Sequence, residues 1–368
     1  MLALLFFLIW LTVWGASWPS NVVERLFDRG YRVLFRLPLT EFWQGLLLDG
    51  VYATAARVVA VMLPPMAIFF PLFTLLEEIG YLPRIAFLLD PPMERCGGSG
   101  KQALTLCMGL GCNAVGVTGC RIIESKAARR RAILTNAFVP CNGRFPTLIA
   151  LAGLCCSGVW ASGLVALLVM LGMVGAMGAS ALLRRKGDEE PLFLMELPPW
   201  RKPRLGRLLL RSLGERILRI TGRAILVAAP AGAVLWLLGR FALLPTIASG
   251  LDGLGRFLGM NGVILLGCVL SLPANELLLP VIAMLLSGGS LQSVGGTGLG
   301  LLFSDWSRQT ILCTMVFTVM HWPCATTLLT IRKETGSTLE MLRSFALPTA
   351  FGAVLCLLIR IVGQHLGM

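Results

Sequence analysis

Charged side chains are scarce in this chain: Asp, Glu, Lys and Arg make up 14% of its 368 residues, whereas 56% are hydrophobic. A soluble protein of this length needs far more polar surface. Apolar runs long enough to cross a bilayer recur along the whole sequence. The composition therefore excludes an ordinary soluble protein and predicts a polytopic membrane protein.

Acidic residues are fewer than basic ones, 19 against 32, and the net charge is +13. In a soluble protein this excess would suggest binding to nucleic acid. Here the basic residues gather in short segments between apolar runs, without the interleaved aromatic residues that stack bases. We therefore expect no nucleic-acid partner. Under the positive-inside rule we interpret the segments 121–131, 184–222 and Arg332-Lys333 as cytoplasmic.

Motifs for nucleotide binding, redox chemistry and hydrolysis are missing. Lys101 is followed by Gln102, and Arg95 occupies the position of the upstream glycine, so there is no Walker A motif. No pair among the eleven cysteines has CxxC spacing. No catalytic triad or paired-carboxylate site stands out. We expect a transporter rather than an enzyme, with no permanently bound cofactor.

Length and helix breakers define the expected helices, because helices that are apolar all round show little useful periodicity. Residues 20–48 mix charged residues with Trp and Leu, which predicts an interfacial amphipathic stretch. Two apolar regions, 82–120 and 256–287, contain breakers and are predicted to be re-entrant or broken helices. Membrane-spanning helices are predicted at 2–17, 51–76, 132–155, 158–183, 223–244, 306–331 and 345–365.

The two halves of the chain share an order of features. In each, a spanning helix is followed by a broken segment with an Asn, at Asn113 and Asn275. Each half then has a helix interrupted at Pro-Cys, at 140–141 and 323–324. Loop charge makes the first Pro-Cys helix run outward from the cytoplasm and the second run inward. The repeats are then inverted, which is a general plan of secondary transporters.

The predicted fold is an all-α polytopic membrane bundle with two inverted repeats and broken or re-entrant helices. The N-terminus is expected in the cytoplasm and the C-terminus outside. We divide the chain into four parts: a first membrane helix with an interfacial segment at 1–48, a first repeat at 49–183, a basic cytoplasmic loop at 184–222, and a second repeat with the last membrane helix at 223–368.

The helix breaks carry most of the residues that could bind a ligand. Cys112, Cys141 and Cys324 each lie beside a break, and His321 lies beside the last one. Thiolate, imidazole and amide groups suit a borderline divalent transition metal such as iron and suit magnesium or calcium poorly. Glu276 lies in an apolar run, where a carboxylate is a functional candidate by default. Arg144 lies in the first Pro-Cys break and needs a partner there.

Structural interpretations stay open beside these functional ones. A cysteine in a membrane helix is usually a small packing residue, and His321 is also compatible with capping a freed carbonyl. Glu77 and Glu78 are compatible with a solvated helix end as well as with a gate. For the cysteines away from the breaks we prefer the packing role: Cys107, Cys120, Cys155, Cys156, Cys268, Cys313 and Cys356.

We predict that one cavity near the pseudo-symmetry axis collects the candidate ligands, because an inverted repeat brings related breaks together at the repeat interface. A mixed ligand set holds an ion weakly enough for it to leave again, whereas a four-cysteine cage would trap it. The predicted metal ligands are Cys112, Asn113, Cys141, Asn275, Glu276, His321 and Cys324; the gating or structural candidates are Glu77, Glu78 and Arg144.

Several of these stretches, in this order, resemble the membrane domain of the ferrous iron transporter B (FeoB) family. The resemblance begins near residue 45 and continues to the C-terminus. It implies a pair of Gate-type repeats that form a path for Fe²⁺ across the inner membrane, with the motif cysteines as ligands of the transported ion. The matching stretches are Leu76–Arg84, Gly109–Gly116, Phe138–Pro146, Pro273–Glu276, His321–Thr327 and Lys333–Gly336.

The sequence also departs from that family. Its members carry an N-terminal G-protein domain, whereas this chain begins directly with a hydrophobic helix. We therefore expect any GTPase activity on a separate chain; the alternatives are transport without GTP gating and a truncated gene. The expected partners are Fe²⁺, the lipid bilayer, a separate small G-protein, small cytoplasmic accessory proteins and further copies of the chain.

Two other functions compete with iron transport. Gate-type repeats also resemble parts of nucleoside transporters, so the cargo is alternatively a nucleoside or another divalent metal. Clustered thiols favour a metal, because a nucleoside site requires amide and carboxylate groups instead. The third function is a non-transporting scaffold. Glu276 and Arg144 argue against it, since burying them without function is expensive.

Overall fold

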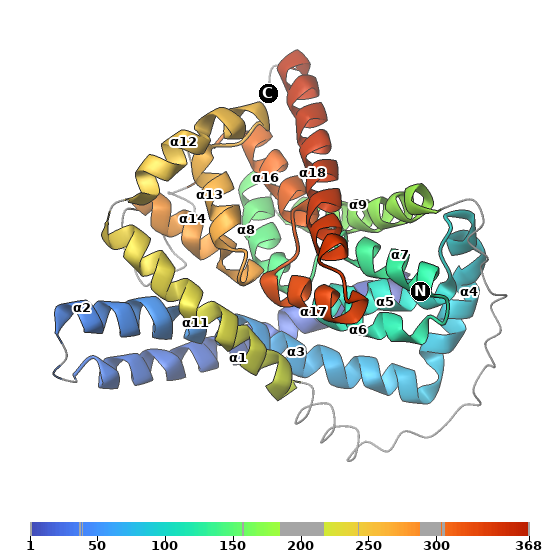
Figure 1. Cartoon of the computed structure of the whole chain (residues 1–368), viewed down its shortest axis with the longest axis horizontal. Helices are drawn as coiled ribbons and strands as arrows, with labels where there is room; N and C mark the ends of the chain where they lie inside the picture. The colour runs from blue at the N-terminus through green and yellow to red at the C-terminus, as the bar shows by residue number, and fades with distance from the viewer. Residues whose placement is uncertain are drawn as a thin grey trace.

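Helices form every regular element of the described residues in the computed structural model (Figure 1). The predicted all-α class is therefore confirmed. Most of the predicted basic loop 184–222 lies outside the described residues. The structure describes residues 2–36, 38, 40–156, 158–184, 217–241, 243–287, 303 and 306–366.

Five helical stretches of the described chain are long and apolar enough to span a membrane. A sixth results if one helix pair, bent by 109°, counts as a single span. In the most apolar 18 residues of the last stretch, only 17% are buried, so most of this part faces outward, as a lipid-exposed helix does. The five stretches match five predicted spans: Glu41–Ile79, Val159–Leu183 (α9), Thr221–Arg240, Arg308–Thr335 and Thr338–Gln364.

The structure divides the predicted span at 132–155 into two short helices, which agrees with the interruption predicted at 140–141, and this stretch is not among the five that are long and apolar enough to span. Helix α7 covers Lys126–Asn136 and α8 covers Phe145–Cys155, with the short helix η3 (Asn142–Arg144) before α8. Pro140 lies between them and cannot donate the backbone hydrogen bond that would continue α7. The break is therefore wider than an interruption at one residue pair.

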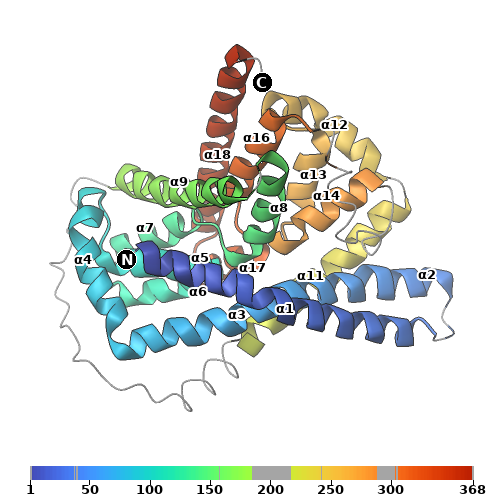
Figure 2. The same ribbon diagram turned by 180° about the vertical axis from the view of Figure 1, so that it is seen from behind.

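The predicted first span at 2–17 and the start of the interfacial stretch form one continuous helix, α1 (Leu2–Leu34). The rest of that stretch includes α2 (Glu41–Gln44) and enters η1 (Gly45–Tyr52), which leads into α3 (Ala53–Ile79). Figures 1 and 2 show α1 lying along α3, with α11 (Leu218–Arg240) packed against α3.

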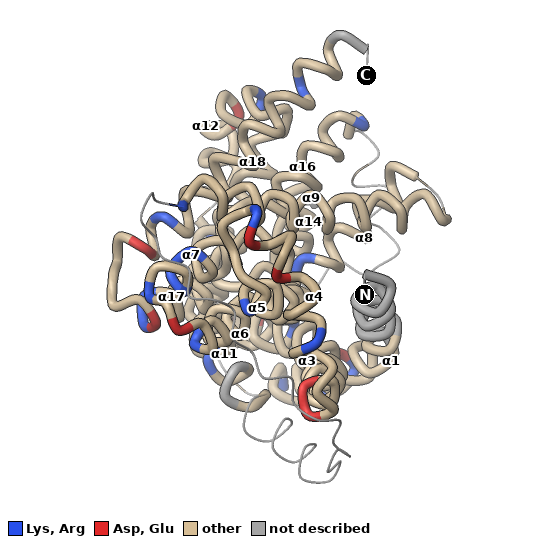
Figure 3. The backbone as a smooth tube through the Cα atoms, turned by 90° about the vertical axis from the view of Figure 1, so that its right-hand side faces the viewer, with Lys and Arg blue, Asp and Glu red and all other residues tan. Residues whose placement is uncertain are grey.

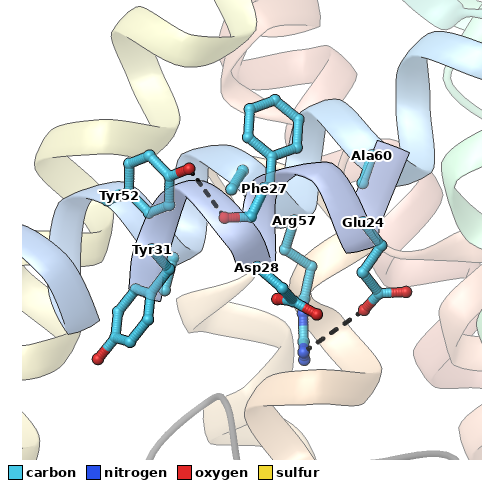
Figure 4. Close-up of a pocket in the computed structure, with 9 residues that line it drawn as sticks. Glu24, Phe27, Asp28, Tyr31, Tyr52, Arg57 and Ala60 are labelled. Carbon is cyan, nitrogen blue, oxygen red and sulfur yellow. Dashed lines mark hydrogen bonds and ion pairs between the residues drawn. The ribbon is translucent and has the colours of Figure 1, made fainter. Parts of the chain in front are cut away.

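Polar contacts explain why the charged part of α1 packs against α3 instead of lying apart as a separate interfacial segment. Tyr52 Oη donates to the carbonyl oxygen of Phe27 at 3.0 Å, and Arg57 forms an ion pair with Glu24 at 3.9 Å (Figure 4). These residues line a pocket between the two helices, together with Asp28. Some charged side chains of α1 therefore bind partners within the protein.

Both regions predicted to be broken are broken. The first contains α4 (Tyr81–Arg95), α5 (Gly100–Gly111) and α6 (Asn113–Gly119). The second contains α13 (Gly262–Leu270), the short helix η5 (Asn275–Leu277) and α14 (Leu278–Ser287). Helix α12 (Leu243–Phe257) precedes α13 and had no counterpart among the predicted helices. The bend of 109° lies between α12 and α13.

Two matching helical hairpins, α4–α5 and α12–α13, relate the halves of the chain. In the first, Asp90 Oδ1 accepts a hydrogen bond from the backbone nitrogen of Gly100 at 2.7 Å. In the second, Asp252 Oδ1 accepts one from the nitrogen of Gly262, also at 2.7 Å. Each aspartate supplies a partner to an otherwise orphan amide at the start of a helix.

The glycines of these hairpins also match. Gly97 and Gly259 occupy left-handed backbone conformations, with φ of 69° and 75°. A Cβ atom at Gly100 would overlap the carbonyl oxygen of Ala86, and one at Gly262 would overlap that of Ala248. The two members of every such pair, including Asn113 and Asn275, are the same number of residues apart in the sequence. The internal similarity is thus more specific than the sequence pattern indicated.

The central element is the interrupted span Arg308–Thr335, made of α16 (Arg308–Met320) and α17 (Ala325–Thr335). In its most apolar 18 residues, 72% are buried, a larger share than in any other described span. Helix α16 packs against α8, α9 and α18 (Thr338–Leu366) (Figures 1 and 2). The break between α16 and α17 consequently lies inside the protein.

Candidate functional site

Each of the three break cysteines is the residue immediately before a helix. Cys112 precedes α6, Cys141 precedes η3 and Cys324 precedes α17. All three have extended backbone conformations, with ψ of 121°, 165° and 158°. The carbonyl oxygen of Cys324 accepts bonds from the nitrogens of Thr327 and Leu328 at 2.9 and 3.0 Å, so the break ends in an ordinary helix start.

These cysteines line one cavity, which encloses about 550 Å³ of empty space counted out to its open mouth. Asn113 and Glu276 also line it, so the structure brings together five of the seven predicted ligand residues. Sequence reasoning missed the other polar or sulfur-bearing residues of the lining: Met62, Met66, Asn142, Thr326 and Thr327.

The methionines had a recognisable signal. Met62 and Met66 are one helical turn apart in α3 and flank Pro64 and Pro65. A proline inside a helix frees a carbonyl of the preceding turn, and thioethers are soft ligands. The same reasoning that selected the break cysteines would therefore have selected these methionines.

Asn275 and His321 do not line the cavity. Asn275 Nδ2 donates to the sulfur of Cys141 at 3.8 Å, so it contacts a lining residue from behind. His321 is fully buried, with Nδ1 2.7 Å from the carbonyl oxygen of Trp322. In this geometry both side chains support the breaks rather than face the cavity.

Arg144 connects the two Pro-Cys breaks. Its guanidinium is fully buried and donates to three backbone carbonyl oxygens of the second break. The acceptors are the oxygens of Val319, Trp322 and His321, at 2.6, 2.8 and 3.1 Å. The partner expected for this arginine is therefore the backbone that the break leaves unpaired, which gives Arg144 a structural role.

Glu77 and Glu78 are exposed at the C-terminal end of α3, and neither lines the cavity. Of the two interpretations left open for them, a solvated helix end agrees with this position.

Asn136 is a further polar residue of the breaks that sequence reasoning missed. Its Nδ2 donates to the carbonyl oxygen of Asn113 at 2.9 Å. Cβ atoms at Gly109 or Gly116 would collide with its side-chain amide, so these glycines leave room for it between α5 and α6. The signal available in the sequence was an asparagine in an apolar stretch, four residues before Pro140.

The side chain of Asn113 donates hydrogen bonds to backbone carbonyl oxygens near the breaks. With its amide nitrogen turned toward them, it donates to the carbonyl oxygens of Gly109 at 3.0 Å and Val139 at 3.2 Å. Val139 precedes Pro140, so the first broken region is tied directly to the first Pro-Cys break.

Among the described residues, Glu276 supplies the only carboxylate of the cavity lining. It packs against Gly143, where a Cβ atom would overlap Glu276 Oε1. The space beside this carboxylate therefore depends on glycine in the first Pro-Cys break.

The described residues contain no group of three or more His, Cys, Asp or Glu side chains already placed to hold a metal ion together. The cavity is thus lined by separate donors and is not a closed cage of the kind that structural zinc sites form. Cys112, Cys141 and Cys324 come from three different helix breaks.

Comparison with known proteins follows the same division of the chain. A family model described as Gate, "Nucleoside recognition", matches residues 59–155 and 222–338. Each matched segment contains one of the two hairpins, one Asn-bearing break and one Pro-Cys break. A second model, "Ferrous iron transport protein B C terminus", matches residues 165–214.

The Gate matches cover more than half of the chain, which therefore belongs to the Gate family of membrane domains. Within that class, the chain is similar to proteins named Fe(2+) transporter FeoB. The one from Synechocystis is 27% identical over 89% of this chain and 53% of its own length. The one from Staphylococcus aureus strain COL is 29% identical over 89% of this chain and 50% of its own length. The resemblance stated from the motifs is confirmed.

A third relative joins two functions in one polypeptide. It is the "Fe(2+) transport protein A/Fe(2+) transporter FeoB fusion protein" of Porphyromonas gingivalis, 31% identical over 62% of this chain and 26% of its own length. The chain spans about half the length of the first two relatives it matches.

Proposed function

We propose that this chain forms the membrane passage for ferrous iron, the transported substrate, and that the ion moves through the cavity between the helix breaks. The observation that carries this proposal is the convergence of Cys112, Cys141 and Cys324 with Glu276 on one cavity. The names of the relatives give the substrate class.

The donor set fits an ion in transit. Thiol, thioether, carboxylate and amide groups suit Fe²⁺ better than Mg²⁺ or Ca²⁺. A thiol must lose its proton to bind a metal, so each cysteine becomes a ligand only when an ion displaces that proton. Because the donors are not already assembled, an ion is held by a few of them at a time and is released to the next.

The two halves act as inverted repeats in this proposal. The hairpins that share the Asp90–Gly100 and Asp252–Gly262 contacts supply the related elements. Their opposite orientation rests on loop charge under the positive-inside rule. The orientation puts the N-terminus and the loops 121–131 and 184–222 in the cytoplasm and the C-terminus outside, in a bacterial-type inner membrane.

Partners belong to the proposal too. The sequence has no Walker A motif, so in this proposal GTP-driven gating comes from a separate G-protein. The fusion relative suggests a small accessory protein of the Fe(2+) transport protein A type. Assembly of several copies around the passage is compatible with the outward apolar faces of the spans.

Nucleoside transport is the second candidate, because the description of the matching Gate model names nucleoside recognition. Asn113, Asn142, Thr326 and Thr327 line the cavity and offer hydrogen bonds to a ribose or base. The three thiols and two methionines favour a metal over a nucleoside, since they offer a nucleoside only weak hydrogen bonds.

Uptake into proteoliposomes separates the two cargoes. The purified chain is reconstituted and given either radioactive Fe²⁺ under anaerobic, reducing conditions or radioactive uridine, each with and without a G-protein partner and GTP. We expect saturable iron uptake above that of protein-free vesicles and no uridine uptake. Uridine uptake without iron uptake would contradict the iron proposal.

A further inference from the structure

A second cavity lies apart from the cysteine cavity and shares no lining residue with it. It encloses about 830 Å³ of empty space counted out to its mouth. Three elements meet there: α7, the C-terminal end of α9 and the N-terminal part of α18. Its lining consists of Ala127, Arg130, Arg131, Leu134, Leu183, Arg343 and Leu347.

Arginines are the charged residues of this lining. Three of them line the cavity, and two, Arg130 and Arg343, share the carboxylate of Glu340. Glu340 Oε1 accepts from Arg130 and, at 2.8 Å, from Arg343. Each guanidinium has five N–H donors, and the side chains of Arg130 and Arg343 are 45% and 40% exposed. Because Arg130 and Arg343 share one carboxylate, the pair keeps a net positive charge and N–H donors for an anion.

Part of the lining is apolar. Leu134, Leu183 and Leu347 line the cavity beside the arginines. Guanidinium groups together with leucines match the two parts of an amphipathic anion. Figure 3 shows basic segments gathered about α7, as the positive-inside rule expects for a loop at the membrane surface.

The neighbouring helix faces point to a lipid. Helix α9 ends and α18 begins beside the cavity, so it lies where two membrane spans reach the bilayer surface. Leu182, at the end of α9, is 82% exposed, and Leu339 and Leu342 of α18 are 53% and 58% exposed. These exposed apolar side chains lie on the same two helix ends that line the cavity and offer contact to acyl chains.

We propose that this cavity binds the phosphate of an anionic phospholipid, whose acyl chains lie along α9 and α18. Guanidinium groups recognise phosphate oxygens through paired, charge-assisted hydrogen bonds. Basic pockets between membrane helices are known to suit anionic headgroups. A bound lipid would link α18 to α7 through Arg343 and Arg130. Under the proposed orientation this is the cytoplasmic leaflet.

The test measures lipid binding to the purified, delipidated chain in detergent by native mass spectrometry. Three probes are used separately: dioleoylphosphatidylglycerol, dioleoylphosphatidylcholine and inorganic phosphate. The main variant is Arg343→Gln, which leaves Glu340 paired with Arg130. Arg343→Lys keeps the charge but loses the planar fork. Arg256→Gln is the matched control, because that arginine is 79% exposed and lies on α12.

We expect the wild-type chain and the Arg256→Gln variant to retain phosphatidylglycerol equally. The Arg343→Gln variant should bind it about tenfold more weakly, as expected for losing one charge-assisted contact, and Arg343→Lys should lie between. Phosphatidylcholine should bind weakly to all. Equal binding of both lipids, or equal retention by Arg343→Gln and wild type, would overturn the proposal. Binding of inorganic phosphate as tight as that of phosphatidylglycerol would also overturn it, because the cavity would then be a free-anion site.

Discussion

Arg144, in the break between α7 and α8, donates to the carbonyl oxygen of Trp322, in the break between α16 and α17, at 2.8 Å. The two breaks therefore stabilise each other. A helix that unwinds inside a membrane leaves carbonyl groups without partners, and protein must supply them. Here the first break supplies a buried guanidinium to the second, and Cys141 and Cys324 are placed on the same cavity as a result.

Replacing Arg144 should destabilise the whole arrangement. In an Arg144→Met variant, three buried carbonyl oxygens lose their donors, and each costs about 1–3 kcal/mol. We expect a loss of roughly 3 kcal/mol or more, measured as a lower melting temperature of the purified protein in detergent. Arg256→Met is the control and should change stability by less than about 0.5 kcal/mol. Equal melting temperatures for both variants would show that Arg144 does not hold the breaks.

The matched hairpins predict matched sensitivity at two glycines. Alanine at Gly100 or Gly262 puts a methyl group onto a backbone carbonyl, of Ala86 or Ala248, which cannot swing aside as a side chain can. We expect each substitution to cost about 3 kcal/mol, again as a lower melting temperature.

Gly163→Ala is the control for these substitutions, because nothing lies within 4 Å of the added atom. Alanine within a helix should be neutral or stabilising by about 0.5–1 kcal/mol. A Gly100→Ala or Gly262→Ala variant as stable as Gly163→Ala would mean that the hairpins are not packed this closely.

Composition and helix breakers were sufficient to predict most of the fold. Long apolar runs define five spans, because a membrane helix must exceed a fixed length. Pro140 and Pro323 mark the breaks because proline lacks the amide that a helix needs. The span at 132–155 is interrupted at Pro140 as predicted, but its break covers residues 137–144 and is wider than the predicted residue pair.

Contacts between distant residues could not be predicted from the sequence. Charged residues such as Glu24 suggested an interfacial amphipathic stretch, whereas Glu24 pairs with Arg57 on α3. At the site, sequence placed the cysteines at the breaks correctly. It could not tell which neighbours face the cavity, because the breaks combine extended residues with very short helices and keep no single period that fixes side-chain direction. Asn275 and His321 therefore support the lining instead of joining it.

The position of the Glu276 carboxylate should matter for transport. A Gly143→Ala variant pushes this carboxylate out of the place it occupies in the cavity, and Glu276→Gln removes its charge. We expect both variants to fold and to transport iron at least about tenfold more slowly, measured as initial uptake into proteoliposomes. Gly153→Ala, with open space around the added methyl, should transport like wild type. Unimpaired uptake in Glu276→Gln would remove the carboxylate from the path.

Ferrous iron should protect the cavity cysteines from alkylation. Cys324 is partly exposed and lines the cavity, whereas Cys156 is exposed at the end of α8, away from it. The wild-type chain is treated with N-ethylmaleimide under anaerobic conditions, with and without Fe²⁺, and the modified peptides are measured by mass spectrometry. Iron should slow modification of Cys324 and leave that of Cys156 unchanged. Equal slowing at both sites would indicate a general effect of the metal on the reagent.

The central claim is that the cysteines at the breaks carry the transported ion, and serine substitution with initial iron uptake tests it most directly. Cys141→Ser and Cys324→Ser are compared with Cys155→Ser and Cys356→Ser, which lie outside the cavity lining, at equal amounts of reconstituted protein. The account predicts that the first two lose at least about tenfold in uptake, because a soft ligand is lost, and that the other two match wild type. Equal uptake in all four variants would contradict it and leave the cysteines as packing residues.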